Sequence, residues 1–493
     1  MARDRTAPIL FFTLLALYLA VAGGRLYVND AYVKLAVARS LTDRCALDVP
    51  PHGKLTVFSP ADGKTYAKFG ILHSLLWTPA TFLGGALVRA GAIPESQRVL
   101  FEGTLASLLS PVATALAVLL FYFWARAVYG RREGALAAAL LLGLATFFWP
   151  YAKRSWTETP QTAFLVGAAL LLHAPGRSAG RGRLFAGGLL LGGATALRIT
   201  GVVLVPLFSL LLIPSPWNTK RWIERCAAAL LGFLAAVIPL VVGLNWIRFG
   251  DPISLFAWRS GGFTTPFLTG LAGLLVSPGE SIFLYAPVTI AGAAALVLHR
   301  RRAPRLHLFC GAVVVALILL YAPWWFHAYT WGPRFLLPAL PFLLLPLASP
   351  LVGRSRRWRR LIVVLVLITA FVQVPGLLFH LGGLPQMEAP LVRHGIHPPD
   401  RPLSRGEIWF HPLRNRLVAH WIVFGETVAG KPPTDSLDLW PLTLRNLFGI
   451  PLRITLPAQL FLLLAGTTGA AVLVRRASGW GKEENGDQGR GSV

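Results

Sequence analysis

The chain has 493 residues, of which 55% are hydrophobic and only 14% are charged. A mean hydropathy of +0.59 excludes an ordinary soluble enzyme. Lys and Arg outnumber Asp and Glu by 47 to 21, which gives a net charge of +26. Because the basic residues cluster between apolar blocks, without the interleaved aromatics of a nucleic-acid module, we expect them to face anionic lipid and expect no nucleic-acid partner. Cys45, Cys226 and Cys310 are too few and too scattered for a disulfide framework or a zinc site.

Apolar blocks of about 15 to 25 residues, long enough to cross a hydrocarbon core about 30 Å thick, recur along the chain and predict an all-α polytopic membrane protein. The first block, residues 8–24, follows a basic start and imitates a secretory signal. Many further hydrophobic spans follow it, so we expect it to be retained as the first helix. Basic runs mark the cytoplasmic side at residues 126–132, 177–183, 220–225, 300–305, 354–360 and 475–476.

Each interval between two basic runs must contain an even number of crossings. Residues 184–213 therefore indicate two short helices hinged near Arg198, which would lie at the outer surface. An odd number of crossings must precede Arg126, so one of the two apolar stretches there should not cross. We assign residues 70–92 as a re-entrant or interfacial piece, because this stretch contains Pro79 and two adjacent glycines. The sequence leaves open whether it crosses the bilayer.

About twelve transmembrane helices result, in a bundle with external juxtamembrane helices and loops. They are expected at residues 8–23, 100–124, 134–149, 159–174, 184–197, 199–213, 226–247, 281–298, 306–321, 335–350, 361–380 and 454–474. Polar segments on the outer face follow at residues 25–69, 150–158, 248–280, 323–334 and 381–453.

This pattern divides the chain into three parts. Residues 1–350 form a transmembrane catalytic module with its first external loop at 24–70, residues 351–477 form C-terminal helices with an external cap loop at 381–453, and residues 478–493 form a disordered tail. Four histidines lie in the cap loop, and their spacing over Pro-rich sequence favours surface histidines over a metal site. These are His394, His397, His411 and His420.

Asp30 follows the first predicted helix directly, where the chain leaves the bilayer. Two structural interpretations are open: Asp30 is the N-cap of a helix over residues 31–41, or it forms a weak pair with Lys34 four residues later. The segment 62–70, Asp-Gly-Lys-Thr-Tyr-Ala-Lys-Phe-Gly, returns the same loop to the membrane with two lysines near the headgroup level. A carboxylate and ammonium groups at one interface could bind an anionic lipid and carry out proton chemistry on it.

These segments resemble the first external loop of GT-C superfamily glycosyltransferases, and most closely the protein O-mannosyltransferase and aminoarabinose transferase branch. The resemblance is carried by Asp30, the helix at residues 32–36, the segment 62–70, Pro79 and two later segments, 277–287 and 331–338. It covers the chain to about Ser349 and specifies the superfamily well and the substrate poorly.

The resemblance implies a membrane glycosyltransferase that moves a sugar from a polyprenyl-phosphate donor to an acceptor hydroxyl on the exoplasmic or periplasmic face, with inversion. Glycoside hydrolysis needs a second carboxyl to protonate the leaving oxygen, whereas a lipid phosphate leaves as a stable anion. Asp30 would be the general base, and Lys68, Arg334 and Arg198 would bind the donor phosphate. The implied partners are the polyprenyl-phosphate sugar lipid, an acceptor glycan, lipid or protein, and the inner or plasma membrane.

Further polar residues complete the candidate site. Glu158 could bind the acceptor, bind Mg²⁺ or Mn²⁺ together with Asp30, or cap the helix that follows it; two carboxylates are a weak metal signal, so no cofactor is assigned. Tyr66 and His327 are candidates for the same acceptor site, and the aromatics around His327 form either an interfacial belt or a sugar-stacking wall.

Two of the candidate arginines also have structural interpretations. For Arg334 the structural interpretation is interfacial snorkelling beneath an aromatic belt. Arg198 is costly in lipid and should face protein or a cavity, where it either contacts phosphate or anchors the hinge. Glu280 departs from the family pattern, which more often has a basic residue there, so a phosphate role for its segment is in doubt.

An alternative function is a polyprenyl-phosphate lipid carrier or flippase without transferase activity. A carrier should have ionisable groups near mid-bilayer in several spans, whereas here the charges concentrate at one face. The chain also lacks a glycine-rich nucleotide motif, which argues against a cytosolic nucleotide-sugar donor.

Overall fold

The computed structural model describes residues 4–173, 180–214, 216–253, 263–301, 303–324, 330–380, 382–431 and 437–478. His327 and residues 479–493 of the predicted tail lie outside the described residues. The main helices are α1 (Thr6–Ala20), α2 (Asn29–Arg44), α3 (Ile71–Arg89), α4 (Glu95–Ser107), α5 (Leu109–Tyr129), α6 (Arg132–Leu144), α7 (Phe148–Ala152), α8 (Glu158–Leu172), α9 (Arg181–Leu197), α10 (Val205–Phe208), α11 (Thr219–Val237), α12 (Leu244–Phe249), α14 (Phe267–Val276), α15 (Ile282–Tyr285), α16 (Val288–Leu298), α17 (Pro304–Tyr321), α18 (Leu340–Leu344), α19 (Pro350–Arg354), α20 (Arg356–Leu378), α21 (Leu384–Arg393), α22 (Arg405–Phe410), α23 (Arg416–Val428), α24 (Trp440–Phe448) and α25 (Leu452–Ala477). Short 3-10 turns complete Ile199–Leu212 and Arg334–Ala348, and a π-helical segment joins α11 to α12.

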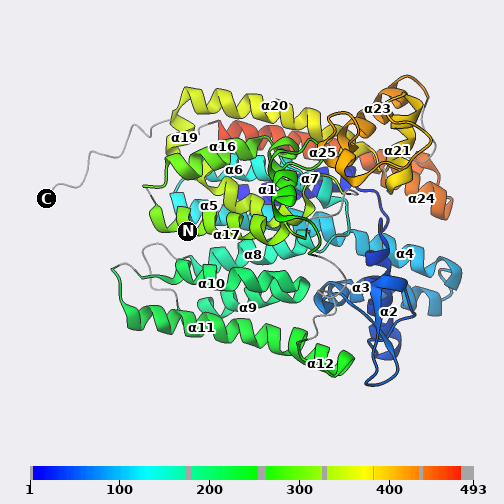
Figure 1. Ribbon diagram of the computed structural model, residues 1–493, viewed down its shortest axis with the longest axis horizontal. Helices are drawn as coiled ribbons and strands as arrows, with labels where there is room; N and C mark the ends of the chain where they lie inside the picture. The colour runs from blue at the N-terminus through cyan, green and yellow to red at the C-terminus, as the bar shows by residue number, and fades with distance from the viewer. Residues whose placement is uncertain are drawn as a thin grey trace.

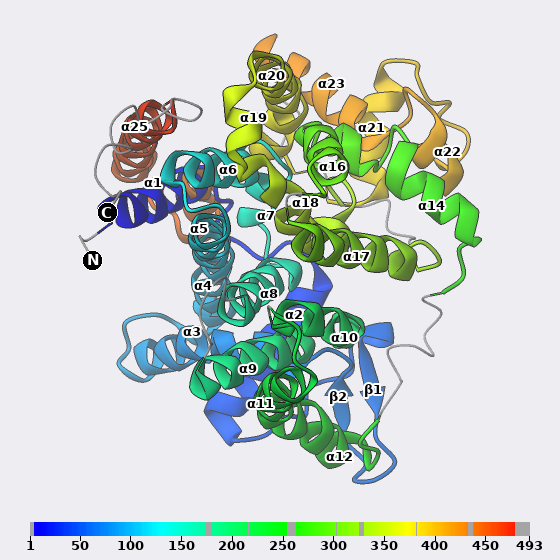
Figure 2. The same ribbon diagram turned by 90° about the vertical axis from the view of Figure 1, so that its left-hand side faces the viewer.

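The predicted all-α polytopic architecture is confirmed. Each of the expected spans overlaps helical residues, and six helices are long and apolar enough to cross a membrane, with shorter apolar helices between them. The helices of the bundle run roughly along one direction, and many of them are seen nearly end-on in Figure 2. The apolar stretches form helices because backbone groups in a hydrocarbon core must be hydrogen-bonded within the segment.

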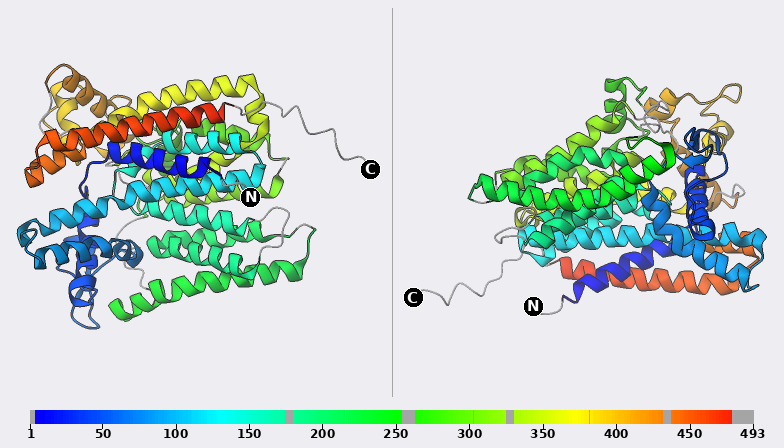
Figure 3. Two further views of the ribbon diagram at one scale, coloured as in Figure 1. Left: turned by 180° about the vertical axis from the view of Figure 1, so that it is seen from behind. Right: turned by 90° about the horizontal axis from the view of Figure 1, so that it is seen from below.

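The two ends of the bundle differ. Helices α11 and α20, whose first turns carry basic runs, begin at the end where the chain termini lie (Figure 1). Helices α2, α3 and α21 to α24 gather at the opposite end (Figures 1 and 3). By the excess of basic residues on the cytoplasmic side, the first end is cytoplasmic and the second is the outer end.

Arg198 breaks the helical run between α9 and the turns at Ile199–Leu212. The backbone of Arg198 is extended, with φ −151° and ψ 114°, and it separates two helical segments. The parity of the basic runs predicted a hinge between two short helices at this residue. Helix α9 packs closely on α11, because a Cβ at Gly188 would lie 1.8 Å from the carbonyl oxygen of Ala229. Small residues permit such backbone approach where lipid tails supply no hydrophobic driving force.

The first external loop departs from a purely helical architecture. It contains α2 and a short antiparallel hairpin of β1 (Thr56–Phe58) and β2 (Thr65–Ala67), in which Val57 pairs with Tyr66. The following helix, α3, is long and apolar enough to cross a membrane. It lies across the view along the bundle in Figure 2 and packs against α2 and α4, an orientation consistent with the interfacial expectation for residues 70–92.

The cap loop contains α21 to α24 and is fastened to the bundle by a buried ion pair. The Lys153 ammonium lies 2.9 Å from a carboxylate oxygen of Asp438, and both side chains are fully buried. Lys153 also donates to the carbonyl oxygen of Leu377 at the end of α20, at 2.9 Å. Arg25 lies 3.3 Å from the same carboxylate, so Asp438 joins the cap to the start of the first external loop.

The interpretation of the cap histidines as surface residues is wrong for two of the four. His397 and His420 are buried, because the cap folds into packed helices whose interior accepts these rings. His420 contacts the Trp331 ring and lies with Nδ1 2.8 Å from the carbonyl oxygen of Arg416, one turn earlier. The His420 ring therefore lies in a packing contact with Trp331 and is hydrogen-bonded within its own helix.

Candidate active site

A cavity of about 1160 Å³ lies at the outer end of the bundle, between the first external loop, the α7–α8 connection and the Arg198 break. Its charged lining residues are Asp30, Lys54, Lys68, Arg198 and Arg334. Asp30 is the only carboxylate among the described residues that line the cavity. One carboxylate and four cations therefore line the cavity, and the buried Glu158 and Lys34 beside it add one charge of each sign, so positive charge is in excess.

Asp30 stands in the first turn of α2. The N-cap of this helix is Val28, which makes no side-chain cap, so the N-cap interpretation of Asp30 is not the observed one. Asp30 lines the cavity, whereas Lys34, one helical turn later on α2, is buried in the protein interior.

Glu158 is buried beside the cavity and binds two of its arginines. One carboxylate oxygen lies 2.7 Å from the Arg198 guanidinium and 3.2 Å from Nε of Arg334. Glu158 is the first residue of α8, Arg198 lies at the α9 break, and Arg334 opens the turns at Arg334–Ala348. One carboxylate thus forms ion pairs with two arginines that are remote in sequence, at one wall of the cavity, and it accepts a hydrogen bond from Arg198.

Lys34 is a second buried cation at the same place. Its ammonium group donates to the Thr157 hydroxyl at 2.9 Å, and it lies 4.9 Å from the centre of the Phe69 ring. Burial lowers the pKa of Lys34 to about 8, and the nearby carboxylates of Asp30 and Glu158 oppose that shift. The sequence related Lys34 only to Asp30, because nothing in it shows that Thr157, directly before α8, lies beside Lys34.

Lys68 reaches the cavity because the end of the first loop passes very close to α9. A Cβ at Gly70 would lie 2.3 Å from the carbonyl oxygen of Ala196, so only glycine permits this approach. Lys68 and Phe69 line the cavity directly before this contact, and Leu197 and Arg198 line it directly after Ala196. The loop motif and the helix break are therefore joined into one cationic wall.

Aromatic rings surround the arginines. The Arg334 guanidinium lies 3.8 Å from the centre of the Trp156 ring, and the Arg198 guanidinium lies 4.3 Å from that of Phe335. Trp324 lines the cavity, which is the position that a ring stacking on a sugar would need. Trp331 is fully buried, and its ring N–H donates to the Gln373 side chain at 2.7 Å. Of the described residues in the aromatic segment, Trp324 thus lines the cavity and Trp331 lies in the core. Snorkelling does not describe Arg334, which is buried.

Tyr66 is not brought to the cavity. Its hydroxyl donates to Asp62 across the β-hairpin, and its ring packs against Phe249. Tyr66 is the central residue of β2, where successive side chains point to opposite faces of the hairpin. Its side chain therefore lies on the face opposite to those of Thr65 and Ala67. Glu280 is buried and lies outside the cavity lining, in agreement with the doubt about a phosphate role for its segment.

The carboxylates of the site are not grouped as a metal centre. Within the part of the chain that the structure describes, no group of three or more His, Cys, Asp or Glu residues could hold a metal ion. Glu158, which was considered as a partner of Asp30 for Mg²⁺ or Mn²⁺, places one carboxylate oxygen between two guanidinium groups. Its chemistry at this site is that of a counter-ion to the arginines.

The fold and the cavity define a polytopic membrane protein with a cavity at its outer end that is lined mainly by cations. Residues 100–246 match the family model of dolichyl-phosphate-mannose-protein mannosyltransferases. The structure is similar to that of ArnT from Cupriavidus metallidurans bound to undecaprenyl phosphate, with a TM-score of 0.56 and 16% identity over 97% of this chain and 78% of that chain. The apo structure of the same ArnT gives a TM-score of 0.52 and 15% identity over 94% of this chain and 76% of that chain.

These structural similarities show that the chain shares the fold of ArnT, and the predicted GT-C-like fold is confirmed. The archaeal oligosaccharyltransferase AglB from Archaeoglobus fulgidus also resembles the chain, at 12% identity and a TM-score of 0.48 over 81% of this chain and 60% of that one. Comparison of the sequence with curated proteins gave no match.

Proposed function

We propose that the protein is a membrane glycosyltransferase that moves a sugar from a polyprenyl-phosphate donor to an acceptor hydroxyl on the exoplasmic face, with inversion. The observation that carries this proposal is the cavity in which Asp30 alone faces Lys54, Lys68, Arg198 and Arg334. One carboxylate suits a reaction with one proton to remove, and several cations suit a leaving group that bears negative charge.

The reaction balances with the residues of the cavity. Asp30 accepts the proton of the acceptor hydroxyl while its oxygen attacks the anomeric carbon of the sugar. The bond from that carbon to the phosphate oxygen breaks on the opposite face, and the lipid phosphate leaves with the bonding electron pair. Lys68, Arg198 and Arg334 stabilise the charge that develops on the phosphate, so no second carboxyl is needed to protonate the leaving oxygen.

Undecaprenyl phosphate in the ArnT structure supports a polyprenyl-phosphate donor for this chain. The role of Glu158 is then to orient Arg198 and Arg334, in place of the acceptor-binding role expected from the sequence. The identity of the sugar and of the acceptor depends on the shape of the cavity near Trp324 and the start of the cap at residues 382–384.

The donor class is tested by mass spectrometry of lipids that co-purify with the protein. A polyprenyl phosphate or its glycosylated form is the expected species. The protein is then reconstituted in vesicles with polyprenyl-phosphate hexose and candidate acceptors. Release of the polyprenyl phosphate with glycosylation of the acceptor supports the transferase, whereas transbilayer movement of the intact donor without release of the sugar supports the carrier.

The transfer rate should depend on the charge of Lys34. Because burial lowers the pKa of Lys34 to about 8, the side chain is a cation below that pH and loses its charge as the pH rises through it. We expect kcat/KM to fall by about tenfold per pH unit on the alkaline side if the cation supports the phosphate or Asp30.

The variant Lys34→Arg keeps its charge throughout this range, so its alkaline decline should move to a higher pH. The pH profiles of the wild-type protein and of Lys34→Arg are compared with that of Lys64→Arg, a change of an exposed lysine in the β-hairpin. Superimposable alkaline limbs in wild type and Lys34→Arg would show that Lys34 does not titrate in the reaction.

A further inference from the structure

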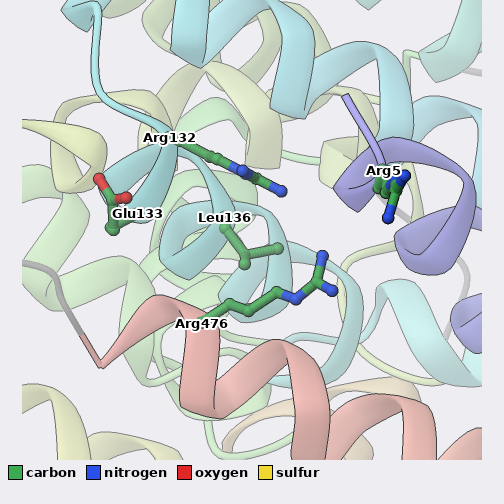
Figure 4. A pocket seen from close by; sticks show the side chains of 5 residues that line it. All are labelled: Arg5, Arg132, Glu133, Leu136 and Arg476. Carbon is green, nitrogen blue, oxygen red and sulfur yellow. The ribbon is translucent and has the colours of Figure 1, made fainter. Parts of the chain in front are cut away.

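A second pocket lies at the cytoplasmic end of the bundle, opposite to the candidate active site. Its volume is about 400 Å³, and it is lined by Arg5, Arg132, Glu133, Leu136 and Arg476. Arg5 directly precedes α1, Arg132 to Leu136 belong to the first turns of α6, and Arg476 belongs to the last turn of α25. Figure 4 shows the guanidinium groups of Arg132 and Arg476 extending toward the side on which Arg5 lies, and the Glu133 carboxylate pointing away from them.

Positive charge is in excess around this pocket. Asp4 forms ion pairs with Arg126 and with Arg132, the second at 3.3 Å. Arg5 forms no ion pair with an acidic residue in the described part of the chain, and Arg476 donates instead to the Thr6 hydroxyl at 3.2 Å. Three arginines and one glutamate therefore line the hollow, and an anion bound there would offset the excess positive charge.

The position of the pocket specifies the kind of anion. The basic runs place this end at the cytoplasmic surface, at the level of the lipid headgroups. The helices that flank the pocket expose apolar side chains toward their surroundings, with Phe12 of α1 at 64% and Val474 of α25 at 58%. A phosphate between the arginines would therefore leave its acyl chains against these side chains, as in basic pockets between transmembrane helices that bind anionic lipids.

Helix α25 packs on α1 through close glycine contacts at Gly466 and Gly469, and it also contacts α6. It lies along α1 at the edge of the bundle (Figures 2 and 3), and its buried residues are Thr455, Gln459, Gly466 and Leu473. Its Gln459 side chain donates to the carbonyl oxygen of Ala20 at 2.8 Å near the outer end, so the cytoplasmic end depends on Arg476 and the packing near it. A ligand held jointly by Arg132 and Arg476 would connect α25 to α6.

We propose that this pocket binds the phosphate of an anionic phospholipid headgroup from the cytoplasmic leaflet and so fastens α25 to α1 and α6. The ligand chemistry is a phosphate monoanion recognised by guanidinium groups, with the lipid as its source. This site is separate from the donor cavity, which lies at the other end of the bundle.

The proposal is tested on the full-length protein in detergent, by native mass spectrometry and thermal unfolding with added dioleoyl phosphatidylglycerol, dioleoyl phosphatidylcholine or inorganic phosphate. We expect phosphatidylglycerol to bind and to raise Tm more than phosphatidylcholine does, and inorganic phosphate at the same concentration to have no such effect. Equal shifts with both lipids would refute a headgroup site, and a shift with inorganic phosphate equal to that with phosphatidylglycerol would refute the lipid as its source.

Two variants distinguish lipid binding in the pocket from the general attraction of basic residues to anionic lipid. Arg476→Gln should weaken phosphatidylglycerol binding by about tenfold or more, the usual loss for a hydrogen bond to a charged group. Its neighbour Arg475 is exposed and does not line the pocket, so Arg475→Gln is the matched control, with a loss of about fivefold at most. Equal losses in the two variants would overturn the proposal.

Arg476→Gln also removes the hydrogen bond to Thr6, so a poorly folded variant would give no binding constant. Arg5→Gln serves in that case, because Arg5 lines the pocket and forms no ion pair within the described residues. An unchanged affinity for phosphatidylglycerol in Arg5→Gln would count against the site.

Discussion

Asp30→Asn is expected to lower the rate of sugar transfer by about 10²–10⁴-fold, the range that a general base contributes. Asparagine keeps the size of the side chain but cannot accept the proton of the acceptor hydroxyl. Since Asp30 makes no helix cap, α2 should fold as before. Turnover is measured with polyprenyl-phosphate sugar at saturating acceptor, and lipid binding is measured separately with the polyprenyl phosphate alone.

The same first loop provides the control. Asp62 is exposed on the β-hairpin and does not line the cavity, so Asp62→Asn should retain nearly the full rate. Removal of the Asp30 charge from a cationic cavity should, if anything, tighten the binding of the phosphate. Full turnover in Asp30→Asn would defeat the assignment of the base, and loss of both turnover and lipid binding would indicate a structural role.

Glu158→Gln is expected to lower the free energy of unfolding by about 3–5 kcal/mol, because it leaves buried arginine charge without its partner. The change removes the negative charge of the carboxylate whose oxygen lies 2.7 Å from Arg198 and 3.2 Å from Arg334. Unfolding is followed in mixed detergent by circular dichroism. A matched change of an exposed carboxylate, Glu95→Gln, breaks a surface pair with Arg39 and should cost about 0–1 kcal/mol.

The double variant Glu158→Gln/Arg198→Gln distinguishes coupling from two independent losses. If the carboxylate exists to hold the arginines, the double variant should lose less stability than the sum of the single variants. The KM for the donor should also rise in Glu158→Gln, since Arg198 and Arg334 are no longer held against the cavity. Additive losses of stability with an unchanged donor KM would contradict the counter-ion role.

Sequence patterns predicted the membrane architecture in detail. Hydropathy indicated the spans because each helix must satisfy its own backbone and cover itself with apolar side chains, both of which are local requirements. Charge parity indicated the helix break at Arg198 and the assignment of residues 70–92, because the distribution of Lys and Arg is also readable along the chain. The resemblance in short motifs led to Asp30, Lys68 and Arg334, all of which line the cavity.

Other parts of the fold could not be predicted in this way. The β-hairpin at Thr56–Ala67 and the packed interior of the cap, with buried His420, depend on partners far along the chain. Tyr66 stands within the motif that carried the resemblance, yet the strand directs its ring to Phe249. Sequence spacing along an irregular loop does not fix the direction of a side chain.

The sequence by itself determined that this protein is a helical membrane bundle of the GT-C type with its candidate carboxylate after the first helix. Only the tertiary structure decided that Glu158 holds Arg198 and Arg334, that Lys34 is buried against Thr157, and that Asp438 fastens the cap. The physical reason is the range of the interactions: hydropathy acts within one helix, whereas buried ion pairs join residues on separate elements and exist only once those elements have packed.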